Sequence, residues 1–327
     1  MAIEKALKYC RSSLQNVSRS FALTIPFIEK NILVPILVGY LEARVMDSFE
    51  DENTGKEIDS EKRAENINKI ISIIKDPESL KSQKHIEDIG IAANDFISNP
   101  HYLDLAQNMD KVIILHKTMD QYSQSSISFW FGRMAEGMEK YLNTRIDTFE
   151  QLDEYCYYVG GTVGGFVTDL LIKNTIKADS SSIDILRMKS DDFGLFLQKV
   201  NIIRDFREDI TRNEKIFWPY QIFHEQEIIP HQTLDRLNEE KSMLILEKMI
   251  SDATKHIGHV RNYINAVPED YPGYKRFCMV NFLMAVETIN KMKNNPDVFY
   301  SDSPIKIEKS VKDRIIENPS ECFESVC

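Results

Sequence analysis

Two stretches of the sequence carry carboxylates at the spacing that places side chains on one face of a helix. In RVMDSFEDE, the carboxylates at i, i+3 and i+4 are Asp47, Glu50 and Asp51. In LFLQKVNIIRDFREDI, the polar residues that share one face are Gln198, Asn201, Arg204, Asp205, Glu208 and Asp209. Ionised carboxylates at this spacing repel, and a bridging divalent cation removes that cost. Oxygen ligands favour Mg²⁺, which completes its coordination shell with water and substrate phosphates. The pattern therefore indicates either two walls of one Mg²⁺ pocket or two solvated helix faces.

The neighbours of the first acidic stretch favour the metal pocket. Tyr40 and Arg44 project to the same helical face as Asp47, at i−7 and i−3. The residues between them are strongly apolar, which is not typical of a solvated surface helix.

Short amides favour a lined cavity at the second stretch as well. Gln198 and Asn201 lie among Leu, Phe, Val and Ile, where a surface helix more usually carries Lys or Glu. Arg204 and Lys199 are cations within reach of a phosphate on this segment.

The stretch YCYYVGGTVGG places glycines at two i, i+4 spacings, Gly160 with Gly164 and Gly161 with Gly165, just after Tyr155. It does not have the spacing of a dinucleotide-binding fingerprint. The glycines allow a close approach to a helix, either by another helix or by a long apolar ligand in an aromatic-flanked slot.

A fourth stretch, SRSF, covers Ser18 to Phe21. It fits a helix N-cap followed by a core phenylalanine. In a phosphate-binding pocket, Arg19 and the two serines would instead be diphosphate ligands. The seven histidines follow no metal-binding spacing, and we expect them to be structural or solvated.

Composition excludes several classes of protein. The chain has 327 residues, 43% of them hydrophobic, with 40 Lys+Arg against 51 Asp+Glu and a net charge of −11. That balance argues against nucleic-acid binding. The five cysteines have no CxxC spacing, which favours reduced thiols in a cytoplasmic protein. We see no signal peptide, and the longest apolar run, ILVPILVGYL, is too short for a transmembrane segment; peripheral membrane association stays open.

Apolar residues recur at helical spacing along the chain, and strand alternation is almost absent, so we predict an all-α helical bundle. We expect one domain over residues 1–327, with a C-terminal tail from about 300. The predicted helices include 1–20, 33–52, 103–141, a helix from a Thr148 cap, a central helix from about 191 that holds 195–210 unbroken, 234–266 and 274–293.

The ordered motifs resemble those of the squalene and phytoene synthase family, and most closely the squalene synthases (farnesyl-diphosphate farnesyltransferases). The motifs are VSRSF, ARVMDSFEDE, YCYYVGGTVGG, GLFLQKVNIIRDFREDI and FWP, over residues 10–310. The resemblance implies an isoprenoid-synthase fold with a central cavity. It also implies a Mg²⁺-dependent prenyltransferase that acts, as a monomer, on prenyl diphosphates and releases its product with or without membrane contact.

By position, the resemblance assigns roles to residues of this chain. The metal ligands would be Asp47, Glu50, Asp51, Asp205 and Asp209. The catalytic residues would be Tyr155, Tyr40, Arg44 and Arg204. The substrate-binding residues would be Ser18, Arg19, Phe21, Gln198, Asn201, Gly161 and Gly165. The NADPH-binding residues would be Lys306 and Asn201.

The implied reaction joins two farnesyl diphosphates head to head to give presqualene diphosphate. A second step then converts presqualene diphosphate to squalene. This chain departs from the family pattern where the second step would occur. Glu308 stands where an arginine that helps to bind NADPH is expected, and Asn281 and Phe282 replace an expected Pro-Gln pair. Alternatives are a family member that works without NADPH, releasing presqualene diphosphate, a dehydrosqualene-type or another terpene product, and a non-catalytic helical scaffold.

Overall fold

The structure is a computed structural model that describes residues 1–52, 54, 59–213 and 215–326. The prediction of an all-α protein is confirmed, because the described residues form helices and turns and include no strand. The chain divides into two compact units, which are described separately below. The first holds Met1–Asn143 and Gly165–Ile176, and the second holds Thr144–Gly164 and Lys177–Cys327. Whether these units form one domain, as the sequence predicts, stays a prediction.

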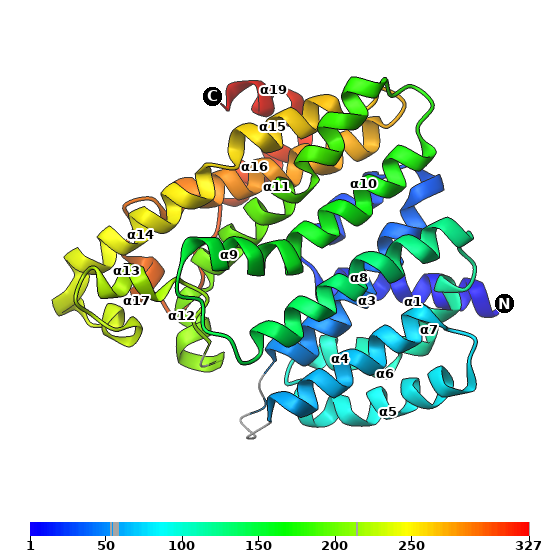
Figure 1. The fold of residues 1–327 in the computed structure, drawn as a ribbon. Coiled ribbons are helices and arrows are strands. Elements are labelled where there is room, and N and C mark those ends of the chain that lie inside the picture. The colour runs from blue at the N-terminus through cyan, green and yellow to red at the C-terminus, as the bar shows by residue number, and fades with distance from the viewer. Residues whose placement is uncertain (53, 55–58, 214, 327) are drawn as a thin grey trace. The chain divides into compact units, whose positions relative to one another are not determined.

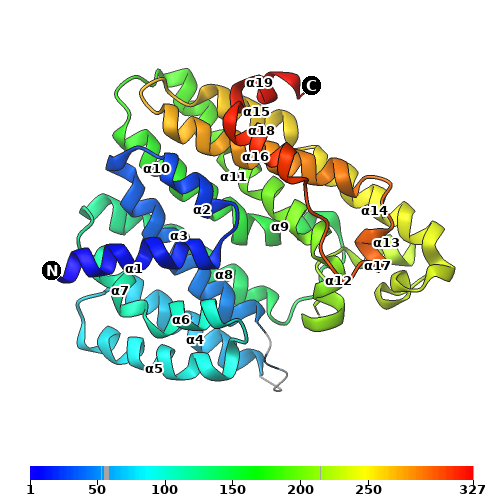
Figure 2. The ribbon, with the colours of Figure 1, turned by 180° about the vertical axis from the view of Figure 1, so that it is seen from behind.

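The first unit is a set of antiparallel and crossing helices (Figures 1 and 2). Its helices are α1 (Ala2–Val17), α2 (Phe21–Thr24), α3 (Lys30–Asp51), α4 (Ser60–Lys75), α5 (Leu80–Phe96), α6 (Pro100–Gln107), α7 (Met109–His116), α8 (Gln121–Tyr141) and, from Gly165 onward, α10 (Thr162–Asn174). α4 packs against α5 and α8, and α1 packs against α7 and α3. α3 lies at the core of this unit, since 14 of its 22 residues are buried.

The second unit is arranged around the long helix α11 (Ser180–Arg204), which packs against α14, α15 and α16. The other helices are α9 (Phe149–Cys156), α12 (Phe206–Glu208), α13 (Tyr220–His224), α14 (Glu239–Thr254), α15 (Ile257–Ala266), α16 (Pro272–Met292), α17 (Asp297–Tyr300), α18 (Lys309–Glu317) and α19 (Pro319–Ser325). Two π-helical turns, Tyr157–Gly161 and Asp209–Asn213, interrupt the α-helical course. α18 and α19 pack on α16, so most of the expected C-terminal tail is folded onto this unit.

Some predicted helix boundaries are confirmed. α3 begins three residues before the prediction and ends one residue earlier. The predicted cap of α9 is a full capping box, in which the Thr148 hydroxyl accepts from the Gln151 amide. The Gln151 side chain in turn accepts from the Thr148 amide at 3.2 Å.

Other predicted helices were wrong in extent because short polar side chains interrupt them. The stretch 103–141 forms three helices, and the Asp120 carboxylate accepts from the amides of Tyr122 and Ser123 to start the last of them. The stretch 234–266 also contains two helices, α14 and α15. α11 begins earlier than predicted, at a cap by Asp179, and ends at Arg204, because Asp205 leaves helical geometry with φ −95° and ψ 4°. Residues 195–210 are therefore not one helix.

The glycine-rich stretch packs directly against α11 in the second unit. A Cβ on Gly160 would lie 2.6 Å from the carbonyl oxygen of Gly194, and a Cβ on Gly164 would collide with the carbonyl oxygen of Ser190. Close helix packing, one of the two alternatives from the sequence, is thus what the structure shows at Gly160 and Gly164. The packing brings the π-helical turn and α11 into backbone contact.

We expect Gly194→Ala to lower the free energy of unfolding by about 1–3 kcal/mol, because its Cβ would collide with the Gly160 backbone and overpack the helix contact. Urea denaturation measures the change. Gly258→Ala is the matched control, since a Cβ on Gly258 meets no atom within 4 Å. Equal stability of the two variants would contradict this packing constraint.

Candidate functional site

The first acidic cluster lies on the last two turns of α3, in the first unit. Asp47 is half-buried, and its Oδ2 lies 3.5 Å from Arg44 Nη1. Glu50 is buried, with 2% of its surface exposed, and Asp51 is half-buried. The cluster is thus partly withdrawn from solvent and is not a freely solvated helix end.

The SRSF stretch packs against Tyr40, which lies two turns before this cluster on α3. Ser18 Oγ accepts a hydrogen bond from the Phe21 amide at 3.0 Å, which turns the chain from α1 into α2. The Phe21 ring lies 5.3 Å from the Tyr40 ring, and the Tyr40 hydroxyl donates to the Val17 carbonyl at 3.4 Å. The predicted residues Ser18, Phe21 and Tyr40 are therefore brought together, whereas Arg19 is exposed to solvent.

Arg44 carries positive charge into the same region. Its Nη2 donates to the Tyr40 hydroxyl at 3.4 Å, and its guanidinium lies 5.4 Å from the Tyr102 ring centroid. Burial opposes the charge of Arg44, but the Tyr40 hydroxyl and the Asp47 carboxylate outweigh that effect and raise its pKa. Arg44 is a permanent cation next to the first acidic cluster.

A buried ion pair anchors the same helix on its other face. Glu42 Oε1 of α3 lies 2.8 Å from His116 Nδ1 of α7, and both side chains are fully buried. Burial disfavours the imidazolium, but the charge and hydrogen bond of Glu42 raise the pKa of His116 overall. Sequence reasoning missed this contact, because Glu42 and His116 are 74 residues apart.

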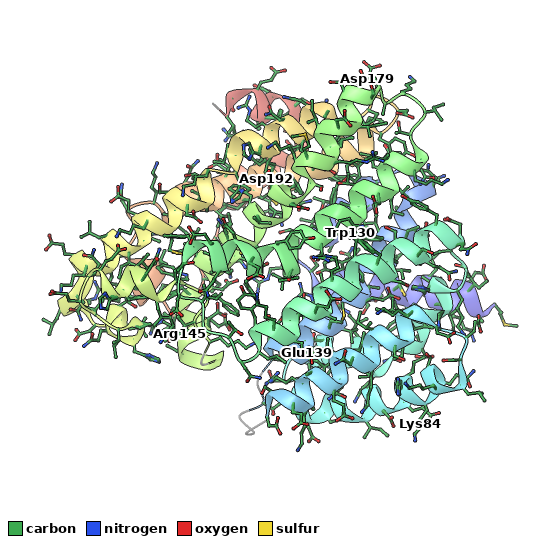
Figure 3. The ribbon with its side chains drawn as sticks, in the orientation of Figure 1. Lys84, Trp130, Glu139, Arg145, Asp179 and Asp192 are labelled. Atoms are coloured by element: carbon green, nitrogen blue, oxygen red, sulfur yellow. The ribbon has the colours of Figure 1, made fainter. Side chains whose placement is uncertain are left out.

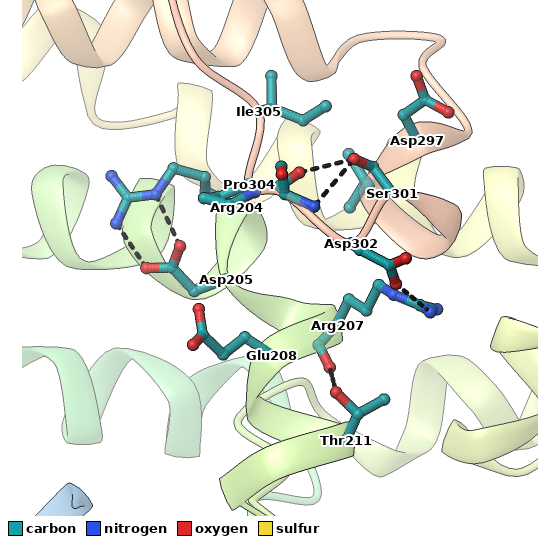
Figure 4. A pocket seen from close by; sticks show the side chains of 12 residues that line it. Arg204, Asp205, Arg207, Glu208, Thr211, Asp297, Ser301, Asp302, Pro304 and Ile305 are labelled. Carbon is teal, nitrogen blue, oxygen red and sulfur yellow. Dashed lines mark hydrogen bonds and ion pairs between the residues drawn. The ribbon is translucent and has the colours of Figure 1, made fainter. Parts of the chain in front are cut away.

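The second acidic cluster lies where α11 ends, in the second unit. Arg204 Nε and Nη2 donate to the two oxygens of Asp205 at 2.8 and 2.5 Å. Burial opposes the charge of Arg204, but its bonds to Asp205 and the charges of Asp209 and Glu208 raise its pKa. Figure 4 shows the Glu208 carboxylate turned toward Asp205.

Arg204, Asp205 and Glu208 line a cavity of about 330 Å³ together with residues of α17 and of the segment between α17 and α18. Arg207 Nη1 donates to the Phe299 carbonyl at 2.9 Å. Its Nη2 donates to Asp302 at 3.0 Å across the cavity (Figure 4). The cavity therefore has charged walls of both signs, with four carboxylates against two guanidinium groups, which suits a polar ligand more than an apolar one.

Asp209 lies one turn beyond Asp205. Its amide donates to the Asp205 carbonyl at 2.9 Å, and its own carbonyl accepts from the Lys215 amide at 3.0 Å. Gln198 of α11 lies beside Gly160 of the π-helical turn. Asn201, one turn later on α11, is exposed.

Lys199 does not reach toward a phosphate, and that prediction is wrong. Its side chain is 1% exposed and pairs with Asp252 at 2.5 Å and with Asp153. Burial opposes its charge, but the two carboxylates raise its pKa. The lysine joins α11 to α9 and α14, because the half-buried Asp153 and the buried Asp252 hold it there.

Tyr155 is buried and stacks on Phe217, with ring centroids 5.0 Å apart. The two glycines predicted to bind substrate have close neighbours. A Cβ on Gly161 would lie 2.9 Å from the Tyr157 ring and 3.2 Å from Leu195, and one on Gly165 would collide with the Trp130 indole of α8 (Figure 3). Side-chain packing explains both glycines; their role in substrate binding stays a prediction.

The positions that depart from the family pattern have clear structural roles. Phe282 is fully buried, 5.7 Å from the Phe196 ring and 5.8 Å from the Phe323 ring, so it belongs to the core of the second unit. Asn281 is buried, and its amide donates to the Phe277 carbonyl at 2.9 Å. Glu308 is exposed and accepts from Lys291 at 2.6 Å, so its charge is compensated. Lys306 is exposed.

Asp192, His256 and His259 form a cluster that the sequence did not reveal, since it joins α11 to α15 (Asp192 is labelled in Figure 3). Both Nδ1 atoms lie within 2.9 Å of Asp192 Oδ1. Lys199 Nζ lies 3.1 Å from His256 Nε2, and an ammonium only donates. His256 therefore keeps its proton on Nδ1 and donates a hydrogen bond from Nδ1 to Asp192. Its Nδ1 is thus not free to bind a metal.

None of the helices in the described ranges combines the length and apolar character needed to cross a bilayer.

Residues 14–310 match the model of the squalene/phytoene synthase family. The chain belongs to this family, and the predicted membership and isoprenoid-synthase fold are confirmed. It is thus a member of a family of prenyl-transferring enzymes.

Among named relatives, the chain is 28% identical to squalene synthase 1 of Arabidopsis thaliana over 97% of this chain and 74% of the relative. It is also 28% identical to the squalene synthase of Nicotiana benthamiana over 94% and 69%. A solved complex of TcSQS with the ligand BPH1237 is 28% identical, with a TM-score of 0.84 over 98% of this chain and 88% of that chain. A dehydrosqualene synthase at 17% identity and a TM-score of 0.64 shares the fold.

The buried Glu42–His116 pair predicts a pH-dependent stability. The pKa of His116 is raised in the folded chain, so the pair contributes fully below the unfolded pKa of about 6.5 and loses its contribution as pH rises through the folded value. The stability advantage of the wild type over His116→Gln should therefore shrink between pH 6 and 9. Urea denaturation across that range measures it; an advantage that grows with pH would contradict the charged pair.

Proposed function

We propose that this chain condenses two farnesyl diphosphates head to head to presqualene diphosphate and converts this product to squalene. One observation carries the proposal. The chain is 28% identical to squalene synthase 1 of Arabidopsis thaliana over 97% of its length and carries the two carboxylate motifs on which its resemblance to this family is based. Whether the released product is squalene depends on the second step.

The donor set fits Mg²⁺. Asp47, Glu50 and Asp51 offer carboxylate oxygens on one helix end, and Asp205 and Asp209 offer them on another. The oxygens of Asp205 that accept from Arg204 each keep a second lone pair for a cation. These five residues would hold Mg²⁺, which supplies charge neutralisation for a departing diphosphate.

Arg44 and Arg204 would each bind and orient a diphosphate group. Arg44 and Arg204 stay protonated, since nearby oxygens raise the pKa of each. Their guanidinium groups present pairs of N–H donors to phosphate oxygens and stabilise the charge that develops when the allylic C–O bond breaks. Ser18, Arg19 and Gln198 would add polar contacts to the same groups.

Aromatic side chains would protect the allylic cation after ionisation. Phe21, Tyr40 and Tyr155 present rings and exclude water, which would otherwise capture the cation. The double bond of the second farnesyl diphosphate attacks C1 of the first, and a proton leaves as the cyclopropane closes. The Tyr155 hydroxyl or the released diphosphate would take that proton.

The second step requires a hydride donor, and NADPH is our proposal. Lys306 offers an exposed cation for a cofactor phosphate, and Asn201 offers an exposed amide. Glu308 stands where a cation was expected, but its bond to Lys291 removes the unpaired negative charge that would repel such a phosphate. The departure at Glu308 is therefore less severe than the sequence suggested.

One alternative is a product made without NADPH, either presqualene diphosphate itself or a dehydrosqualene-type or other terpene. Phe282 and Asn281 favour it, because they replace expected residues with a buried ring and a buried amide. A non-catalytic scaffold is a weaker alternative, since the carboxylates of both acidic clusters are retained.

Product analysis separates these reactions. With farnesyl diphosphate and Mg²⁺, we expect squalene only when NADPH is added and presqualene diphosphate when it is left out; mass spectrometry identifies both. Geranylgeranyl diphosphate in parallel reactions tests donor length. The same products with and without NADPH would reject the reductive step and leave the condensation standing.

Removal of one proposed metal ligand tests the metal site. Asp205→Asn should lower kcat by about 100-fold or more, because it removes a ligand charge. Its unfolding free energy should change by no more than about 1 kcal/mol, since the Arg204–Asp205 pair is part-exposed. Asp302→Asn is the matched control, because Asp302 pairs with Arg207 in the same cavity but is 92% exposed. Similar kcat values in both variants would reject Asp205 as a ligand.

A further inference from the structure

The C-terminal end of α3 carries an unfavourable arrangement of charge. Glu50 and Asp51 lie in its last turn, Asp47 lies one turn earlier, and the last turn contains no basic residue. The carbonyl groups at a helix C-terminus already carry partial negative charge, which carboxylates there reinforce. Arg44 of the same helix pairs with Asp47 one turn earlier, and further compensation at the last turn comes from another element.

Arg63 of α4 supplies it. Its Nη1 donates to the carbonyls of Phe49 at 2.7 Å and Glu50 at 3.0 Å, and its Nη2 donates to the carbonyl of Glu52 at 2.9 Å. One guanidinium thus binds three carbonyls at the end of α3, and all three belong to residues in or next to the acidic cluster. An arginine fork can do this where a single ammonium group cannot, because its donors are fixed in one plane.

The position of Arg63 is itself fixed by packing. Its guanidinium lies 5.8 Å from the Phe96 ring of α5, and that ring lies 5.3 Å from Phe49 of α3. Burial lowers the pKa of Arg63, and the charges of Asp51 and Glu50 oppose this shift. The arginine is therefore coupled to the carboxylates by charge and to their backbone by hydrogen bonds.

We propose that Arg63 is a positioning residue that holds the last turn of α3, so that Asp47, Glu50 and Asp51 keep the helical register needed to bind Mg²⁺. The metal part of this inference rests on the proposed function. Arg63 would contact neither substrate nor metal. It acts through the backbone of the residues that would bind the metal.

Two effects of removing Arg63 oppose each other, which makes the inference testable. Loss of a positive charge near the carboxylates of Asp51 and Glu50 would by itself attract Mg²⁺ more strongly. Loss of the three hydrogen bonds would let the last turn fray and weaken Mg²⁺ binding. A positioning role requires the second effect to dominate.

The experiment compares Arg63→Met, Arg63→Lys and the control Arg276→Met with the wild type. Arg276 is matched to Arg63, because it is also half-buried and its Nη2 donates at 2.8 Å to the Ile316 carbonyl at the end of α18. Three quantities are measured on the full chain: amide hydrogen exchange of peptides that cover residues 45–52 without Mg²⁺, Mg²⁺ affinity by calorimetry, and kcat at saturating Mg²⁺.

In Arg63→Met, we expect exchange at residues 48–52 to be about tenfold faster. Mg²⁺ affinity should fall by about tenfold, and kcat at saturating Mg²⁺ should fall much less. Arg63→Lys should lie between the wild type and Arg63→Met, since it keeps the charge and loses the fork. Arg276→Met should leave exchange at residues 45–52 and Mg²⁺ affinity unchanged.

Unchanged exchange at the end of α3 in Arg63→Met would overturn the inference. Faster exchange with equal or tighter Mg²⁺ binding would also overturn it, because Arg63 would then cap the helix without positioning a metal site. If Arg63→Met does not fold, Arg63→Lys carries the same comparison. A wild type that binds no Mg²⁺ would reject the metal part of the proposed function, whereas the exchange data would still decide whether Arg63 orders the acidic turn.

Discussion

The structure depends on holding like charges close together at sites that are only partly open to water. The chain has 51 acidic residues against 40 basic ones, and several carboxylates lie at helix ends or inside the core. Arginine and lysine side chains compensate them at close range: Arg44 beside Asp47, Arg204 on Asp205, and Lys199 between Asp153 and Asp252. A buried carboxylate without such a partner would take up a proton or destabilise the fold.

These cations do different work although they share one chemistry. Lys199 is withdrawn from solvent and joins three helices of the second unit, so its charge is used for structure. Arg44 and Arg204 are only partly buried, and each borders an acidic cluster that remains partly accessible. Burial is therefore the property that separates the structural cation from those that bind ligands in the proposed reaction.

The helical class and the two acidic faces could be predicted from the sequence, because the 3.6-residue helical period is a local property of the sequence. It also grouped Ser18, Phe21 and Tyr40 correctly, through the resemblance to known motifs. It failed at Lys199 and at the break after Arg204, since the partners Asp153 and Asp252 and the backbone turn at Asp205 depend on tertiary contacts. The Glu42–His116 pair and the Asp192 cluster were equally hidden, because spacing along the chain says nothing about pairs 64 or more residues apart.

The contact between Gly160 and Gly194 bears on how this sequence can change over time. At both positions a Cβ would meet main-chain atoms of the other segment, and a main chain cannot be replaced by a smaller group. A larger residue at either glycine therefore has no compensating substitution at the other. Only a shift of the whole helix would make room for it. Single substitutions at these two glycines are therefore not tolerated, whereas the surrounding side chains can vary.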